Sequence, residues 1–350
     1  QVVGGRARRL DIVEADDADV PRDGEAEALA DRVHDVGALL VVVTNPMALG
    51  LFKSPGELGA DVVVGDGQPL GIPLSFGGPY LGFFATRTKH VRRIAGCIIG
   101  ETTDQDGKRA YVMTLRPREQ DIRREKATSN ICTAQVLLAV IAGMFAVYQG
   151  PAGIRKIAAR AHRWAEITAH ALNAWGYEVV TDCMFDTITV HVPARAYAIV
   201  AKAREQRINL RHVDADHIGI SFDETTRRSE VDRLLGCFKT DGLANWPLDQ
   251  IDEAIEECIP ESLRRTSSYL THPVFSTHQS ETRMLRYLRQ FIQIAIMAFF
   301  VFWPALVTRV RELAGPRRHA LLREARPAAV EEGTLVIEVP GAIRSTVSRP

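Results

Sequence analysis

One irregular run, residues 271–282, gathers several side chains that could take part in chemistry. It contains two imidazoles, a phenyl ring, a carboxylate and several hydroxyls. Imidazoles exchange protons near neutral pH, so a run of this composition suits the rim of a site. The residues that we expect to line that rim are His272, Phe275, His278 and Glu281. A purely structural role at an interface is the competing interpretation.

A glycine-rich loop joins two short apolar runs, Asp61–Val64 and Leu81–Ala85. Glycines allow positive φ and close approach of the backbone, which suits either a ligand or a tight connection between strands. The spacing is not G-x-G-x-x-G, and no G-K-[ST] follows, so the loop does not indicate a dinucleotide site or a P-loop. We expect Gly77 and Gly78 to lie on the rim of a site, with a tight connection without a ligand as the alternative.

The composition is that of an ordinary soluble globular protein, with 46% hydrophobic and 25% charged residues. Lysine and arginine (43) balance aspartate and glutamate (43), so no net field favours nucleic acid as a partner. Five cysteines are scattered without a C-x-x-C pair, which argues against a metal site or a disulfide framework and favours a cytoplasmic location. The chain starts at Gln1, and we expect it to be a fragment.

The elements that would position these residues alternate between helix and buried strand. A helix is expected at Glu25–Val36 and a buried parallel strand at Ala38–Thr44, which together with the Asp61–Val64 run predict an α/β sheet. Ala134–Tyr148 is apolar almost all round and predicts a buried helix, capped by a residue of 128–130. We assign residues 1–150 to a partial large domain.

The rhythm of the sequence changes after Gly150-Pro151. A long amphipathic helix is expected over 152–175, followed by strands and helices that predict a smaller α+β domain over 151–245. Residues 246–289 are assigned to a linker and the site-rim segment, and 290–350 to a tail. Other expected elements are a short helix at His90–Ile94, a hairpin around Gly100–Arg109, strands at Tyr177–Thr181, Thr187–Val192 and Ile218–Phe222, and helices at Ala196–Gln206 and Ser229–Cys237.

Several longer stretches, in order, resemble one family. From Gly37 to Arg289 the chain is similar to the P-protein of the glycine cleavage system, and more narrowly to the later part of its N-terminal half. The stretches that carry the resemblance are Pro55–Ala85, Arg118–Gln135, Phe185–Thr187, Ile208–Arg211, Gly219–Thr225 and Arg264–Thr282.

The resemblance implies a fold and a reaction. The fold is α/β, similar to the fold-type-I transferases that depend on pyridoxal 5′-phosphate: a partial large domain with a parallel sheet, plus a smaller α+β domain. The reaction is decarboxylation of glycine, with transfer of the aminomethyl group to a lipoylated carrier, the H-protein. The cofactor supplies the electron sink for such chemistry.

The resemblance also locates a missing group. The family's catalytic half carries a His-Lys pair in the turn after a sheet strand, where this chain has Gln68, and an amide cannot form the imine. We therefore expect the cofactor to be held by the lysine of a partner half, and this chain to be inactive alone. Relatives resemble the site-rim segment with Asn at Ser276 and His at Gln279, so both positions depart from the family pattern.

The resemblance stops after Arg289. Residues 291–307 are almost wholly apolar, near the lower length limit of a membrane span. The interpretations are an anchor, a buried helix or a tail out of register with the ancestral reading frame, of which we favour the last. For the whole chain, the alternatives to a decarboxylase component are a non-catalytic truncated remnant, a partner or structural subunit and, less favoured, a membrane-tethered protein.

Overall fold

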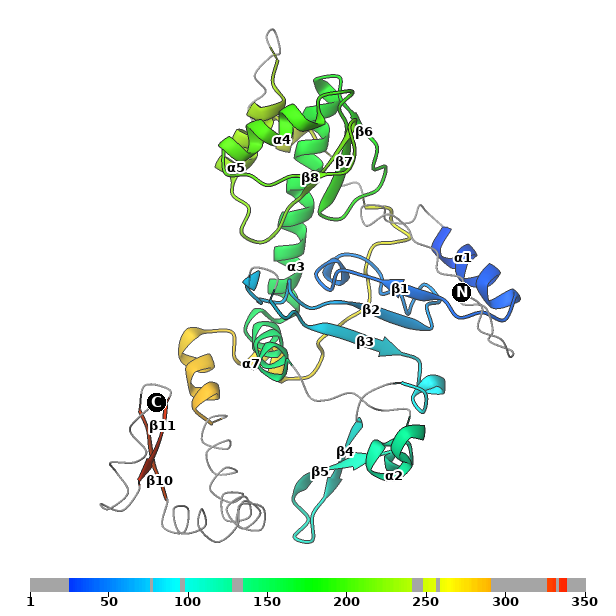
Figure 1. The fold of residues 1–350 in the computed structure, drawn as a ribbon, viewed down its shortest axis with the longest axis vertical. Coiled ribbons are helices and arrows are strands. Elements are labelled where there is room, and N and C mark those ends of the chain that lie inside the picture. Colours follow the sequence, from blue (N-terminus) through cyan, green and yellow to red (C-terminus); the bar gives the residue numbers. More distant parts are fainter. Residues whose placement is uncertain are drawn as a thin grey trace. The chain divides into compact units, whose positions relative to one another are not determined.

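A computed structural model describes residues 25–75, 78–94, 98–127, 135–240, 248–255, 259–290, 326–331 and 334–338 (Figure 1). The chain divides into two compact units, Gln1–Ser276 and Thr277–Pro350. Residues 1–24 and the apolar run 291–307 lie outside the described residues.

The described part of the first unit begins with helix α1 (Glu25–Asp35), followed by a three-stranded sheet of β1 (Val41–Val43), β2 (Val62–Asp66) and β3 (Gly82–Thr86). β1 and β2 are parallel, as predicted, whereas β3 is antiparallel to β2. The expected burial of the first strand is wrong, since Val43 of β1 is 73% exposed. The valine runs form strands because branched side chains suit a pleated, half-buried surface. A small core of Ala30, Val33, Leu40 and Ala60 packs α1 against this sheet.

Short elements connect these strands. A 3-10 turn, η1 (Ala48–Gly50), follows β1, and η3 (Thr88–His90) follows β3. The helix expected at His90–Ile94 is therefore wrong: the helical turn lies earlier and ends at His90. The predicted hairpin is confirmed as β4 (Ile98–Thr103) and β5 (Arg109–Thr114), followed by η4 (Arg116–Arg118), α2 (Gln120–Arg123) and η5 (Arg124–Lys126).

Helix α3 (Val136–Ala174) is interrupted at Gly150, whose φ of 61° and ψ of −178° are not helical. The predicted break at Gly150-Pro151 is thus confirmed. Among the described residues the first half of α3 is not buried as expected, since Leu137 is 77% exposed and only Ala142, Val147 and Gly150 are buried there. The whole of α3 is long and apolar enough to count as a candidate membrane span by length and composition, a test that core helices also pass. The proposed cap at 128–130 lies outside the described residues.

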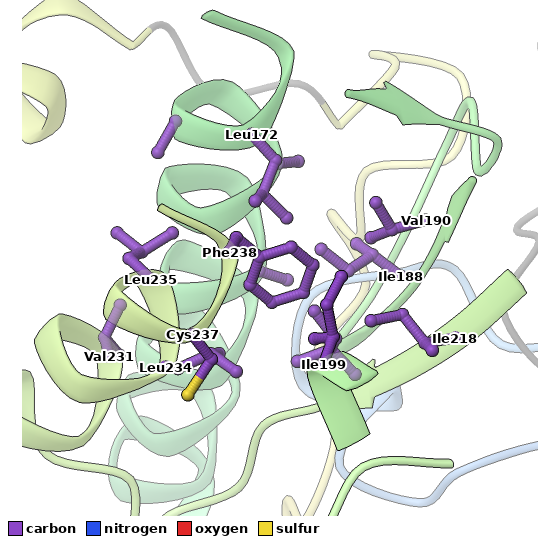
Figure 2. Close-up of a cluster of buried hydrophobic side chains, with 14 of the residues drawn as sticks. Leu172, Ile188, Val190, Ile199, Ile218, Val231, Leu234, Leu235, Cys237 and Phe238 are labelled. Carbon is purple, nitrogen blue, oxygen red and sulfur yellow. The ribbon is translucent and has the colours of Figure 1, made fainter. Parts of the chain in front are cut away.

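The small α+β domain has a four-stranded sheet in the order β6-β7-β9-β8, all neighbours antiparallel. Its predicted helices and three predicted strands are confirmed within a few residues, although β6 is only two residues long; β8 was not predicted. Figure 2 shows the Phe238 ring between Leu172 of α3 and Ile188 of the sheet, inside one buried cluster. The elements are β6 (Glu178–Val179), β7 (Thr187–His191), α4 (Ala196–Glu205), β8 (Arg211–His212), β9 (His217–Ser221), α5 (Arg228–Phe238) and α6 (Leu248–Ala254).

The segment after α6 packs against the residues that follow β1 and against helix α3. The Lys53 amide donates to the Leu263 carbonyl at 2.8 Å, and the Tyr269 hydroxyl donates to the Pro151 carbonyl at 2.6 Å. Leu263 also packs in a second core with Phe52 and Ile154. The short helix α7 (Val274–Thr277) follows. In the second unit, residues 281–290 are helical, and β10 (Arg326–Glu331) pairs antiparallel with β11 (Thr334–Glu338).

Candidate functional site

Two polar turns follow the parallel strands of the first sheet. Because β1 and β2 are parallel, with Val43 opposite Val64, their carboxyl ends meet at one edge. Asn45 lies two residues after the end of β1, and Gln68 lies two residues after the end of β2. Ligands of α/β sheets bind outside the carboxyl ends of the strands, so this edge is the candidate site.

Glycines at this edge allow the backbone and rings to approach closely. A Cβ on Gly65 would lie 2.2 Å from the Thr44 carbonyl oxygen and 2.7 Å from the Phe83 ring. The Gly67 amide donates to the Leu81 carbonyl at 2.5 Å, which ties the loop's two ends together. A Cβ on Gly67 would lie 3.1 Å from the Leu81 carbonyl oxygen, so packing inside this chain accounts for both glycines.

Gln68 occupies the turn where the resemblance would place a lysine. Its amide N–H donates to Asp66 Oδ1 at 2.7 Å, and its Nε2 donates to the Ile72 carbonyl at 2.8 Å. The Ile72 amide in turn donates to the Gln68 carbonyl at 3.1 Å. The side chain and both backbone groups of Gln68 thus form hydrogen bonds within the loop. The bond from its side chain to Ile72 closes the turn between residues 68 and 72.

An amide–carboxylate bond joins this edge to the small domain. Asn45 Nδ2 donates to Asp186 Oδ2 at 3.1 Å, and Asn45 Oδ1 accepts from the Met47 amide at 2.9 Å. The other carboxylate oxygen, Asp186 Oδ1, lies 3.0 Å from the Thr187 hydroxyl, which lies 2.9 Å from the Ser221 hydroxyl. Asp186 immediately precedes β7, so this hydrogen bond connects the turn after β1 to the start of β7 in the small domain.

The environment of Asp186 disfavours its charge. Burial raises its pKa to about 6, although the hydrogen bond from Thr187 opposes the change. The Asp223 carboxylate raises the pKa further, and His162 lowers it. A carboxyl group that titrates near neutral pH beside a strand's carboxyl end has the properties of a functional-site residue.

A buried polar network on α3 supports the same junction. His162 Nδ1 donates to the Phe185 carbonyl at 2.8 Å, and its Nε2 lies 3.3 Å from Glu166 Oε1. Arg163 bonds to Glu166 at 3.1 Å and to Asp252 of α6 at 2.6 Å. Because His162 and Glu166 are each 5% exposed or less, these bonds fix the backbone that carries Asp186.

The opposite edge of the sheet carries a structural carboxylate. Asp61, 1% exposed, accepts from His34 Nε2 at 2.8 Å and from the Leu40 amide at 3.2 Å, and its Oδ1 lies 2.7 Å from Lys89 Nζ. Burial alone would raise the pKa of Asp61, but the hydrogen bonds from Lys89, His34 and Leu40 hold it well below its usual range. This group locks the amino end of β2, away from the candidate site.

The structure places the predicted rim residues in two different units. His272 is exposed and accepts from the Val274 amide through Nδ1 at 3.2 Å, and Phe275 is half-buried in α7. His278 stacks on Tyr287, with ring centroids 4.2 Å apart, in the second unit, which also holds the exposed Glu281. The roles of all four residues stay predictions.

The two loop glycines predicted for the rim are placed differently. Gly77 lies outside the described residues. A Cβ on Gly78 would lie 2.9 Å from the Ser75 carbonyl oxygen, so the turn itself constrains this position.

Sequence reasoning assigned no role to Asn45 or Asp186. The stretch Phe185–Thr187 stood out as part of the resemblance, but its chemistry did not. The two residues are 141 positions apart, so no local pattern links them.

Comparisons with known proteins agree with one another. The family model described as the glycine cleavage system P-protein matches residues 22–238. The glycine dehydrogenase (decarboxylating) of Xanthomonas axonopodis pv. citri is 51% identical over 267 residues, covering 76% of this chain and 27% of that protein. The enzyme of the same name from Cupriavidus metallidurans is 48% identical over 262 residues, covering 75% and 27%.

A solved structure supports the fold. The crystal structure of glycine decarboxylase (P-protein) of the glycine cleavage system, in inhibitor-bound form, matches with a TM-score of 0.56 and 31% identity. The match covers 65% of this chain and 51% of that chain. The present chain thus spans 27% of the length of the curated relatives and about half of the solved one.

Proposed function

The chain belongs to the glycine cleavage system P-protein family, and we propose that it is one component of a glycine decarboxylase. Its fold is the α/β fold of the family, similar to the fold-type-I enzymes that use pyridoxal phosphate: part of a large domain together with a small α+β domain. The observation that carries the proposal is the 51% identity over 267 residues to a glycine dehydrogenase (decarboxylating).

The turn after β2 does not fit covalent attachment of pyridoxal phosphate. That cofactor, when bound, withdraws electrons from the substrate's α-carbon, and such enzymes hold it through a lysine amine. Gln68 offers an amide whose nitrogen already donates to the Ile72 carbonyl. Of the flanking lysines in sequence, Lys53 precedes the strand and Lys89 pairs with Asp61 at the opposite edge.

We therefore assign the lysine to a second, catalytic half of the P-protein. In this proposal the present chain folds against that half and completes its site, and the carboxyl edge at Asn45 and Gln68 is the part of the chain nearest the chemistry. The substrate is glycine, and the aminomethyl acceptor is the lipoylated H-protein. His272, Phe275, His278 and Glu281 are proposed as residues of the rim.

We propose that the assembly is cytoplasmic and that it binds neither nucleic acid nor a membrane. The balanced charge supports the absence of a nucleic-acid partner. In the described part of the chain Cys237 is a free, buried thiol, which is compatible with a reducing compartment.

Co-expression with a lysine-bearing P-protein half tests the proposal. The purified mixture is assayed for exchange of labelled carbon dioxide into glycine, with lipoylated H-protein present. Exchange is expected with both halves and absent with either alone or with the partner's lysine changed to alanine.

The main competing function is a non-catalytic remnant. Co-purification of a folded chain with the lysine-bearing half, without any exchange, would support the remnant and overturn the enzyme proposal. A near-ultraviolet circular dichroism spectrum without fixed aromatic signals would show instead that this chain does not fold under the assay conditions.

A further inference from the structure

Asn45 holds the turn at the carboxyl end of β1 through two opposed bonds. Its Oδ1 accepts from the Met47 amide at 2.9 Å, which shapes the turn into η1. Its Nδ2 donates to Asp186 Oδ2 at 3.1 Å. Because the amide group is planar, fixing Nδ2 also fixes Oδ1, so the small domain's carboxylate sets the orientation of the turn.

The bonds on the far side of Asp186 accommodate both of its protonation states. When Asp186 is ionised, the Thr187 hydroxyl donates to Oδ1 over 3.0 Å, and Ser221 can donate to Thr187 over 2.9 Å. When Asp186 is protonated on Oδ1, both hydroxyls reverse: Asp186 donates to Thr187, and Thr187 donates to Ser221. Hydroxyl groups rotate freely enough to allow either arrangement. The exposed Ser221 gives this chain an end at solvent.

We propose that Asp186 is a positioning residue for the carboxyl edge: its ionised carboxylate holds Asn45 and the turn after β1, and uptake of a proton weakens that hold. The effect on catalysis rests on the proposed glycine decarboxylase function; the effect on the turn does not. Hydrogen bonds to a charged acceptor are roughly twice as strong as neutral ones, so the Asn45 bond weakens when the carboxylate is neutralised.

The charged groups around Asp186 place this change near neutral pH. Asp223, on the loop after β9, raises the pKa of Asp186, and His162, on α3, lowers it. Asn45 contributes an amide and no charge from the β1 side. Burial raises the pKa of Asp186 to about 6, so the carboxylate is mostly ionised at pH 7.5 and mostly protonated at pH 5.

A positioning role and a simple structural role of Asp186 predict different effects of pH and of substitution. The folded pKa of Asp186 lies above its ordinary value of 3.8, so protonation favours the folded state, and stability falls as pH rises through 6. In Asp186→Asn the side chain keeps the shape of aspartate but carries no charge. Its amide oxygen can accept a hydrogen bond from Asn45, and its amide nitrogen can donate one to Thr187. We expect this variant to be at least as stable as wild type at pH 8, while its hold on Asn45 is weak at every pH.

Amide hydrogen exchange of the chain alone tests the turn. In wild type, the protection factor of the Met47 amide should rise about fivefold between pH 5 and 7.5, with a midpoint near 6. In Asp186→Asn it should stay at the low value throughout. Asp214→Asn, which removes an exposed carboxylate elsewhere in the small domain, is the matched control and should behave as wild type. Equal, pH-dependent protection in wild type and Asp186→Asn would overturn the proposal.

The assembled enzyme provides the second readout. Exchange of carbon dioxide by the co-purified halves should lose activity below pH 6 in wild type, and Asp186→Asn should be impaired at pH 7.5 in turnover more than in KM for glycine. Asp186→Glu should restore part of the activity. A pH-dependent Met47 amide without enzymatic exchange would refute the proposed function alone, and normal activity of Asp186→Asn would refute the positioning role alone.

Discussion

The substitution Gly65→Ala tests whether the candidate edge depends on close backbone packing. A Cβ at this position would lie 2.2 Å from the Thr44 carbonyl oxygen and 2.7 Å from two atoms of the Phe83 ring. The ring can turn aside, but the Thr44 carbonyl belongs to the backbone, and the Thr44 amide is bonded to the Val64 carbonyl at 3.0 Å. The strands must therefore separate.

The magnitude follows from these two losses. Overpacking costs typically 1–3 kcal/mol, and a strained ladder bond adds about 1 kcal/mol, so we expect a loss of about 3 kcal/mol. Hydrogen exchange of the β2 amides, measured under native conditions, reports the free energy of opening this sheet. In Gly65→Ala the free energy of opening should be lower than in wild type by about 3 kcal/mol.

Gly82→Ala is the matched control on the neighbouring strand. Gly82 pairs with Asp66 in the same ladder, one position from the Gly65–Phe83 pair, and nothing lies within 4 Å of its added Cβ. Alanine there should leave the opening free energy unchanged or raise it by about 0.5 kcal/mol, because alanine lowers the conformational entropy of the unfolded chain. Equal effects of the two substitutions would refute the packing explanation of the glycine loop.

Two further substitutions address the fold. Asp61→Asn should destabilise the chain by about 1–3 kcal/mol at pH 7, because an amide cannot accept from His34, the Leu40 amide and Lys89 as the buried carboxylate does. Since the folded pKa of Asp61 is lowered, the wild-type advantage is present above pH 3.8 and should vanish as denaturation is followed to lower pH. Ile188→Ala in the small-domain core, at 0% exposure, should cost about 2–5 kcal/mol by urea denaturation, whereas Ile99→Ala, at 57% exposure, should change little.

The small domain is the part of the fold that the sequence predicted well. Thr187–Val192 alternates apolar and polar residues, and Ile188, Val190 and Val192 are all fully buried. The alternation reflects the environment directly, because one face of the strand packs on helices of the same domain. β8, only two residues long, carries no such periodicity.

The first half of α3 shows where sequence reasoning failed. Its all-round apolar pattern predicted burial, yet Leu137 is 77% exposed among the described residues. The apolar composition of this half predicts that another surface packs on it, but it does not identify that surface. The family relationship, in which this chain spans 27% of its curated relatives, agrees with a large domain represented only in part.

The candidate site was only half predictable for a related reason. Gln68 could be recognised because a turn after a strand is a local signal and the resemblance marked the residue expected there. The Asn45–Asp186 bond depends on how the two domains pack, and its partners lie 141 positions apart. A buried carboxylate with a raised pKa becomes visible only when the packing around it is known.

Titration of this chain into a fixed amount of a lysine-bearing P-protein half tests the central claim most directly. With glycine, labelled bicarbonate and lipoylated H-protein present, our account predicts that carbon dioxide exchange rises from background and saturates at equimolar halves. Exchange by the lysine-bearing half that is unchanged by any amount of this folded chain would contradict it.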